Sequence, residues 1–210
     1  LQIFSSYGFF KDGYSKYGLG QSLLLIPWTK AFRAAKEALN ASTYFPNAIA
    51  VYLSGPLVGS SVITFFFLIC RKLGYPLHLA FILSLILGFT TMIWPYTQTL
   101  FSDPTMGFSW LMAFYALLAY RNSRKNGWLV LSGTAVGFSV LTKIVAAYAV
   151  PIFCGYFFYL LISSRGENWK VCFGIPFLKT IAAFFIPMVV MGIAILKYNQ
   201  LRYGNFFSFG

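Results

Sequence analysis

The stretch Ile49–Cys70, IAVYLSGPLVGSSVITFFFLIC, carries no charged side chain along its whole length. An α-helix needs about 20 predominantly apolar residues to cross the ~30 Å hydrocarbon core of a bilayer. Only helices and closed barrels satisfy every backbone hydrogen bond within lipid, and this stretch lacks the strict alternation of a barrel strand. It therefore predicts a membrane-spanning helix.

Further apolar stretches fill most of the remaining chain. They are Leu77–Tyr96, Met106–Tyr120, Trp128–Leu141, Ile144–Ile162 and Phe173–Leu196. Several are long enough for a full span, and the shorter ones need flanking residues to complete one. We therefore predict an all-α fold, a polytopic transmembrane helical bundle of about six spans.

The composition excludes an ordinary soluble domain. Hydrophobic residues make up 59% of the chain and charged residues 10%, with a mean hydropathy of +0.71, whereas soluble domains carry about 25% charged residues. The net charge is +12, but the basic residues are scattered among the connections between apolar stretches. This distribution favours the membrane and anionic lipid phosphates as partners, and argues against nucleic acid.

The region before Ile49 differs from the rest of the chain. Leu19–Phe32 is apolar but too short to span, so it is expected to be interfacial or re-entrant. Thr29–Asn40 has the pattern of an amphipathic helix lying on the membrane surface. We divide the chain into an outer or lumenal loop with this interfacial helix (1–48), the transmembrane bundle (49–197) and the start of the next outer loop (198–210).

Charged residues predict which side of the membrane each connection occupies. Alternate connections contain the basic residues Arg71, Lys72, Arg121, Arg124, Lys125, Arg165 and Lys170. The positive-inside rule places these connections in the cytoplasm. The outer or lumenal side then contains Asp12, Lys16, Asp103, Lys143, Lys197 and Arg202. Lys30, Arg33 and Lys36 would also lie outside and argue the other way, but they are farther from the end of a span.

Charges close to the hydrocarbon are costly, and they are usually paired, solvated in a cavity or functional. Lysine and arginine there could hold the phosphate of a lipid, and a carboxylate could accept a proton from a hydroxyl group. Each residue also has a structural alternative. Asp103 before Pro104 fits a capped helix start, Lys143 could extend from a helix end to the head groups, and Arg202 fits an interfacial aromatic belt. Lys16 could be a solvated anchor.

Four motifs along the chain point to a family. They are Asp12–Gly20 (DGYSKYGLG) with the apolar run to Pro27, Thr97–Pro104 (TQTLFSDP), Gly133 to Gly137 with Leu141-Thr142-Lys143, and Tyr198-Asn199 with Arg202–Asn205 (RYGN). In this order they resemble the GT-C glycosyltransferases, specifically the branch related to protein mannosyltransferases and aminoarabinose transferases. The resemblance covers essentially the whole chain.

The resemblance implies a multi-pass membrane enzyme of the bacterial inner membrane or the endoplasmic reticulum. It would move a sugar from a polyprenyl- or dolichyl-phosphate carrier to a hydroxyl of a lipid, glycan or protein at the outer or lumenal face. The substrate-binding residues that it implies are Lys16, Tyr17, Asp103, Lys143 and Arg202, with Asp103 ordering the pocket. No cofactor is certain, and a divalent metal is compatible with the chemistry.

One family feature is missing from the sequence. Family members carry a catalytic acid in the first outer loop after an N-terminal span, and neither precedes Asp12. We therefore expect the catalytic residue upstream of Leu1, and an inactive fragment in residues 1–210. A transporter or lipid flippase is the alternative function, although the span middles carry no acidic residue and no internal repeat is visible. A structural subunit is a third interpretation.

Overall fold

A computed structural model describes residues 18–39, 45–99, 101–163 and 175–208. In these residues the fold is all-α, as predicted. The helices are α2 (Leu19–Leu39), α3 (Phe45–Lys72), α4 (Leu77–Thr90), α5 (Ile93–Thr97), α6 (Asp103–Ser123), α7 (Asn126–Thr142), the 3-10 helix η1 (Ile144–Ala149), α8 (Val150–Ser163) and α9 (Ile175–Tyr203).

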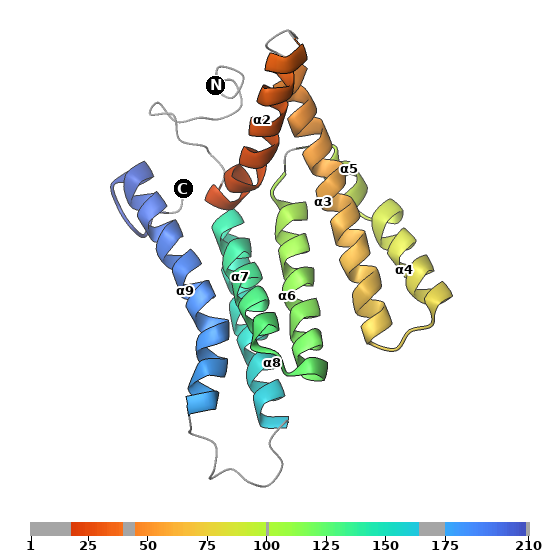
Figure 1. The fold of residues 1–210 in the computed structure, drawn as a ribbon, viewed down its shortest axis with the longest axis vertical. Coiled ribbons are helices and arrows are strands. Elements are labelled where there is room, and N and C mark those ends of the chain that lie inside the picture. Colours follow the sequence, from red (N-terminus) through yellow and green to blue (C-terminus); the bar gives the residue numbers. More distant parts are fainter. Residues whose placement is uncertain (1–17, 40–44, 100, 164–174, 209–210) are drawn as a thin grey trace.

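The helices form a bundle in which α6 and α7 are central (Figure 1). Helix α9 packs against α7, α3 packs against α6, and α4 lies outside α3. The start of α6 and the ends of α7 and α9 lie at one end of the bundle, which we call the Asp103 end. The end of α3 and the α6–α7 turn lie at the opposite end, which we call the Arg121 end.

Three helical segments of the described chain are long and apolar enough to cross a membrane. They are Leu53–Lys72, Ile144–Ser163 and Phe177–Tyr203. These segments correspond to the first, fifth and sixth predicted stretches. The predicted stretches Met106–Tyr120 and Trp128–Leu141 form the helices α6 and α7. Both helices extend beyond the predicted bounds.

The predicted stretch Leu77–Tyr96 is broken in the structure. Helix α4 ends at Thr90, and α5 begins at Ile93 after an extended Thr91. The hydroxyl groups of Thr90 and Thr91 donate to carbonyl oxygens one turn back, a local bond that competes with regular helix geometry. Helix α4 therefore has 14 residues, about 21 Å, which is shorter than the hydrocarbon core.

The two segments predicted before Ile49 form one continuous helix, α2, which includes Pro27. This helix packs against α3 and, at its start, against α7. The predicted loop residues 1–17 lie outside the described residues. The position of α2 relative to a membrane surface stays a prediction.

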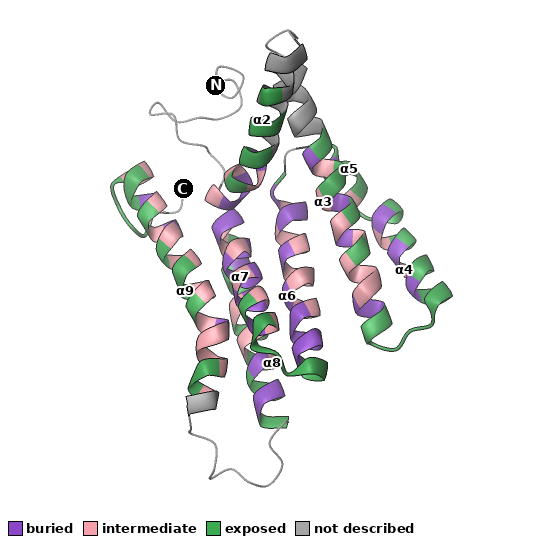
Figure 2. Ribbon diagram, in the orientation of Figure 1, coloured by how far each residue is buried: buried purple, intermediate pink, exposed green. Residues whose placement is uncertain are grey.

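Along α4, small residues face the inside of the bundle and large apolar residues face outward. On α4, Ala80, Ser84 and Gly88 are buried against α3, whereas Phe81 and Phe89 are 56% and 61% exposed. Figure 2 shows this exposed outer surface along α4 and α9. Lipid tails are as apolar as these side chains, so close packing of small residues is what holds membrane helices together. The pattern fits a bundle solvated by lipid.

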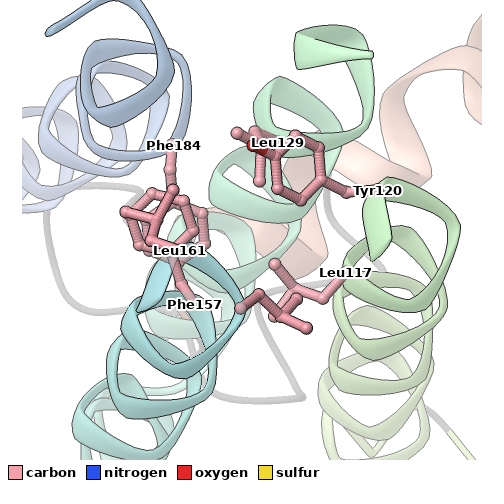
Figure 3. Close-up of a cluster of buried hydrophobic side chains, with 7 residues drawn as sticks. Leu117, Tyr120, Leu129, Phe157, Leu161 and Phe184 are labelled. Carbon is pink, nitrogen blue, oxygen red and sulfur yellow. The ribbon is translucent and has the colours of Figure 1, made fainter. Parts of the chain in front are cut away.

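Gly133 and Gly137, which have small-xxx-small spacing, lie where α7 and α9 approach closely. A Cβ atom added to Gly133 would overlap the carbonyl oxygen of Phe184, and one on Gly137 would lie 2.7 Å from the Cβ of Met191. Towards the Arg121 end, Phe157 of α8 stacks on Phe184 with 4.5 Å between ring centroids. Figure 3 shows these rings in a buried cluster with Leu117, Tyr120, Leu129 and Leu161. The core therefore fixes α9 against α7 and α8.

Candidate functional site: a basic cavity at the Asp103 end

A cavity of about 230 Å³ opens at the Asp103 end of the bundle. Four elements line it: the start of α2, the residue before α6, the end of α7 with the start of η1, and the last turns of α9. The lining residues are Gly18, Leu19, Ser102, Leu141, Thr142, Lys143, Ile144, Ile195, Tyr198, Asn199 and Arg202. Two of them are cationic, so the cavity suits an anionic ligand.

Lys143 is paired with Asp103 at the edge of this cavity. Its Nζ lies 2.8 Å from Oδ1 of Asp103, and the two side chains are 40% and 34% exposed. A partly exposed ion pair of this kind contributes little to stability, ~1 kcal/mol or less. It does, however, hold the ammonium group in one place at the wall of the cavity.

The backbone break after α7 places Lys143 at the cavity. The amide of Lys143 donates to the Ser139 carbonyl as the helical pattern ends, and its own carbonyl accepts from Ala146 in η1. Between these bonds Lys143 is extended, with φ −153° and ψ 124°. Lys143 therefore lies between α7 and η1, and its extended backbone sets the direction of its side chain.

Asp103 begins α6 with Pro104 after it, as the sequence predicted for a helix start. Ser102 occupies the N-cap position and makes no side-chain capping bond, while the Asp103 carboxylate accepts a hydrogen bond from Lys143. A negative charge in the first turn is also favoured by the helix dipole. The structure therefore shows Asp103 in an ion pair rather than in a capping bond.

Arg202 reaches the cavity from the last turn of α9. Its guanidinium group lies 4.5 Å from the centroid of the Tyr203 ring. One turn earlier, the buried Asn199 donates from Nδ2 to the carbonyl oxygen of Phe206, at 3.4 Å. Gly204 ends α9 with a φ of 69°, a conformation that glycine adopts without strain. This turn holds the end of α9 over the cavity.

The start of α2 closes the cavity against α7. A Cβ atom on Gly18 or Gly20 would overlap Thr142, including its backbone at 2.8 Å in both cases. Glycine is therefore required at both positions for this contact. The predicted site residues Lys16 and Tyr17 lie outside the described residues, immediately before Gly18.

The structure thus brings together Asp103, Lys143 and Arg202, three of the five predicted site residues. Lys197 was grouped with them by side, but it is exposed on α9 and does not line the cavity. The sequence did not point to Ser102, Thr142 or Asn199 as site residues, although all three belong to motifs noted in the sequence. Ser102 is buried next to Asp103.

Metal-ligating side chains do not gather in the described residues: no group of three or more His, Cys, Asp and Glu could hold an ion there. The structure therefore assigns no residues of that part to a divalent cation.

Comparison with known families decides what kind of protein this is. The family model for dolichyl-phosphate-mannose-protein mannosyltransferase matches residues 41–195. The chain belongs to this family. No curated protein and no solved structure matches the chain at a significant level. The match contains Asp103 and Lys143, whereas Lys16, Tyr17 and Arg202 lie outside it.

Membership in the mannosyltransferase family makes the chain part of an integral, multi-pass membrane protein with GT-C glycosyltransferase ancestry. The family implies a sugar donor carried on a polyprenyl phosphate. The exposed apolar surface described above is consistent with this location.

We expect the contact between α2 and Thr142 to tolerate no added methyl group. Gly20→Ala should lower the free energy of unfolding by about 1–3 kcal/mol, because the new methyl group meets the Thr142 backbone. Gly107→Ala is the matched control, since no heavy atom lies within 4 Å of its added Cβ, and alanine favours the helix by about 1 kcal/mol. Thermal unfolding in detergent would measure both; equal midpoints would contradict the contact.

Proposed function

We propose that the cavity at the Asp103 end binds the phosphate and sugar of a polyprenyl- or dolichyl-phosphate-linked donor. The observation that supports this most directly is the position of Lys143 and Arg202 on two walls of one cavity. They come from helices α7 and α9, far apart in the sequence. An anion between them would accept charge-assisted hydrogen bonds from both sides.

The size of the cavity suits a head group rather than a whole lipid. A cavity of about 230 Å³ is smaller than the 300–1,000 Å³ of typical drug-sized ligand pockets. We therefore propose that the phosphate and part of the sugar occupy it, while the polyprenyl chain remains in the bilayer. Leu141, Ile144 and Ile195 supply an apolar side to the lining, which suits the first isoprenyl unit.

The residues of the cavity would act on the leaving group of the transfer. An acceptor hydroxyl oxygen attacks the anomeric carbon of the sugar, and the bond from that carbon to the phosphate oxygen breaks. The bonding electrons pass to the phosphate, where Lys143 and Arg202 stabilise the added negative charge. The proton of the hydroxyl passes to a carboxylate base, which we assign to no described residue of this chain.

Asp103 has a positioning role in this proposal. Its carboxylate holds the Lys143 ammonium group at the cavity before the donor arrives. Because an ammonium group has three donors, Lys143 can keep this bond and still donate to a phosphate oxygen. Lys16 and Tyr17 are proposed as further donor contacts, because the family resemblance implies them and in the sequence they directly precede Gly18, which lines the cavity.

We also propose that about six spans form the membrane domain and that the Asp103 end faces the outer or lumenal side. Helix α6 has 21 residues and α7 has 17, or about 32 Å and 26 Å, close to the thickness of the hydrocarbon core. Helices α4 and α5 together would supply the remaining crossing. The basic residues at the Arg121 end then lie in the cytoplasm.

Binding tests this proposal without requiring the chemical step. The chain in lipid nanodiscs should bind dolichyl phosphate mannose, whereas dolichol, which lacks the phosphate, should bind at least tenfold more weakly. Arg202→Gln should weaken binding of the donor about 10- to 100-fold, the effect of losing a charge-assisted hydrogen bond of 1.5–3 kcal/mol. Titration with mass spectrometric detection measures each affinity.

Lys197→Gln is the matched control, because it removes the same charge from an exposed position on the same helix. Its affinity should equal that of the unmodified chain. If Arg202→Gln and Lys197→Gln bound the donor equally well, the cavity would not be the donor site. Movement of the lipid across the bilayer without any sugar transfer by the enzyme would favour a flippase instead.

A further inference from the structure

A second basic surface lies at the Arg121 end, away from the donor cavity. It consists of Lys72 at the end of α3, Lys125 immediately before α7, and the rings of Tyr115 and Trp128. The Nζ of Lys72 lies 5.1 Å from the centroid of the Tyr115 ring. Tyr115 packs edge to face on Trp128, at 6.1 Å between centroids. The backbone of Trp128 donates to the Lys125 carbonyl oxygen at 3.1 Å. We call this surface the Lys72–Lys125 patch.

The neighbouring arginines differ from the lysines of the patch in what they contact. Arg71 donates to the carbonyl oxygen of Tyr75 at 2.8 Å, and Arg124 donates to the carbonyl oxygen of Leu160 at the end of α8. Lys72 and Lys125 are exposed, and no carboxylate whose side chain the structure describes lies at this end. The Lys72 ammonium group thus lies over an aromatic ring, the exposed Lys125 is bonded to Trp128 through its backbone, and no carboxylate among the described side chains neutralises either lysine.

Tyrosine and tryptophan rings prefer the level of the lipid head groups, so the patch lies at the boundary between hydrocarbon and water. Large apolar side chains are exposed at this end, with Leu73, next to Lys72 in the chain, at 51% and Leu77, at the start of α4, at 61%. A soluble acidic partner would leave these side chains uncovered, but a lipid has acyl chains to cover them. The combination of cations, interfacial rings and exposed apolar side chains therefore favours a lipid as the ligand.

We propose that the Lys72–Lys125 patch binds the phosphate head group of an anionic membrane lipid, with the acyl chains along α3 and α6. Lys72 and Lys125 pair with the phosphate, and the acyl chains lie near Phe65, which packs on Tyr115 at 5.6 Å. This lipid is a structural ligand of the leaflet opposite the donor cavity. The inference is independent of the proposed donor site, because it uses none of the same residues.

Titration of the detergent-solubilised chain with phosphatidylglycerol and with phosphatidylcholine tests the proposal. Phosphatidylglycerol should bind more tightly, and Lys72→Gln/Lys125→Gln should weaken its binding about 25-fold, since each lysine near an anionic lipid contributes about fivefold. Lys72→Arg/Lys125→Arg keeps both charges and should retain the binding. Lys30→Gln/Lys197→Gln removes two exposed charges elsewhere and should also retain it.

The fluorescence of Trp128 provides a readout of position. Phosphatidylglycerol with brominated acyl chains should quench tryptophan emission more than brominated phosphatidylcholine, and Trp128→Phe should abolish that difference. The proposal is overturned if Lys72→Gln/Lys125→Gln binds phosphatidylglycerol as tightly as the unmodified chain. It is equally overturned if both lipids bind alike, or if inorganic phosphate displaces the lipid at equal concentration, since the site would then recognise a soluble anion.

Discussion

With the proposed donor site, replacing Lys143 with alanine is expected to slow sugar transfer about 10²- to 10³-fold. This is the usual cost of removing one group that stabilises charge developing in a transition state. The loss should be large because the proposed donor phosphate would develop its charge at the wall of the cavity that Lys143 lines. The substitution also leaves the Asp103 carboxylate, 34% exposed, facing the same anion without its partner.

The rate constant and the affinity separate the two parts of this effect. Stabilisation of the leaving group acts mainly on kcat, whereas loss of ground-state contact with the donor acts on KM. Steady-state kinetics with dolichyl phosphate mannose would measure both. Lys197→Ala is the control for a lysine lost from the same end of the bundle, and it should retain the rate. A Lys143→Ala enzyme with an unchanged kcat/KM would remove Lys143 from the site.

Asp103→Asn resolves what the ion pair contributes. Asparagine keeps a similar shape and an oxygen that can accept a hydrogen bond, but it lacks the charge. If Asp103 only positions Lys143, then Asp103→Asn should reduce the rate much less than Lys143→Ala. The double variant should then lose no more than Lys143→Ala alone, because the partner to be positioned is absent. Such non-additivity is the signature of two residues that act through one contact.

The sequence predicted the apolar helices well because their signal is local. A run such as Ile49–Cys70 has no other stable state in lipid, and helix α3 contains this run. The break after Thr90 was not predictable from hydropathy. The stretch Leu77–Tyr96 stays apolar enough for one span although it contains Thr90 and Thr91. Their effect depends on hydroxyl bonds to the preceding turn, which many threonines within membrane helices make without ending the helix.

The sequence proposed the candidate site as a set of residues but gave no geometry for it. Alternating charge along the connections placed Asp103, Lys143 and Arg202 on one side of the membrane. Which of them pair depends on how α6 and α7 cross, because Asp103 and Lys143 are 40 residues apart in the chain. The same limit explains Lys197, which shares that side but not the cavity. Its direction is set by the rotation of α9, and the sequence contains no measure of that rotation.

The crossing of α7 and α9 is also the reason that the cavity has two cationic walls. Arg202 and Asn199 reach the cavity only if α9 lies against α7 along its length. That approach depends on Gly133, where the α9 backbone at Phe184 occupies the space of a side chain. In the proposed donor site, stability and donor binding are therefore coupled through one glycine, ten residues before Lys143 in the sequence.

Gly133→Ala is accordingly expected to destabilise the fold by roughly 3 kcal/mol, the upper range for overpacking, and to weaken donor binding as well. The added methyl group meets a backbone carbonyl, which cannot rotate away, so α9 must move outward. Gly137→Ala should cost less, because its nearest neighbour is the side chain of Met191. Unfolding in mixed detergent micelles with increasing dodecyl sulfate would measure both free energies.

Gly155→Ala and Gly192→Ala are the controls for this series, because an added Cβ at either position meets no heavy atom within 4 Å. Both should unfold at or above the midpoint of the unmodified chain, since alanine is the better helix former. The expected order of stability is Gly155→Ala, then Gly137→Ala, then Gly133→Ala. A Gly133→Ala chain as stable as the controls would mean that α7 and α9 do not touch at this point, and the two-walled cavity would lose its structural basis.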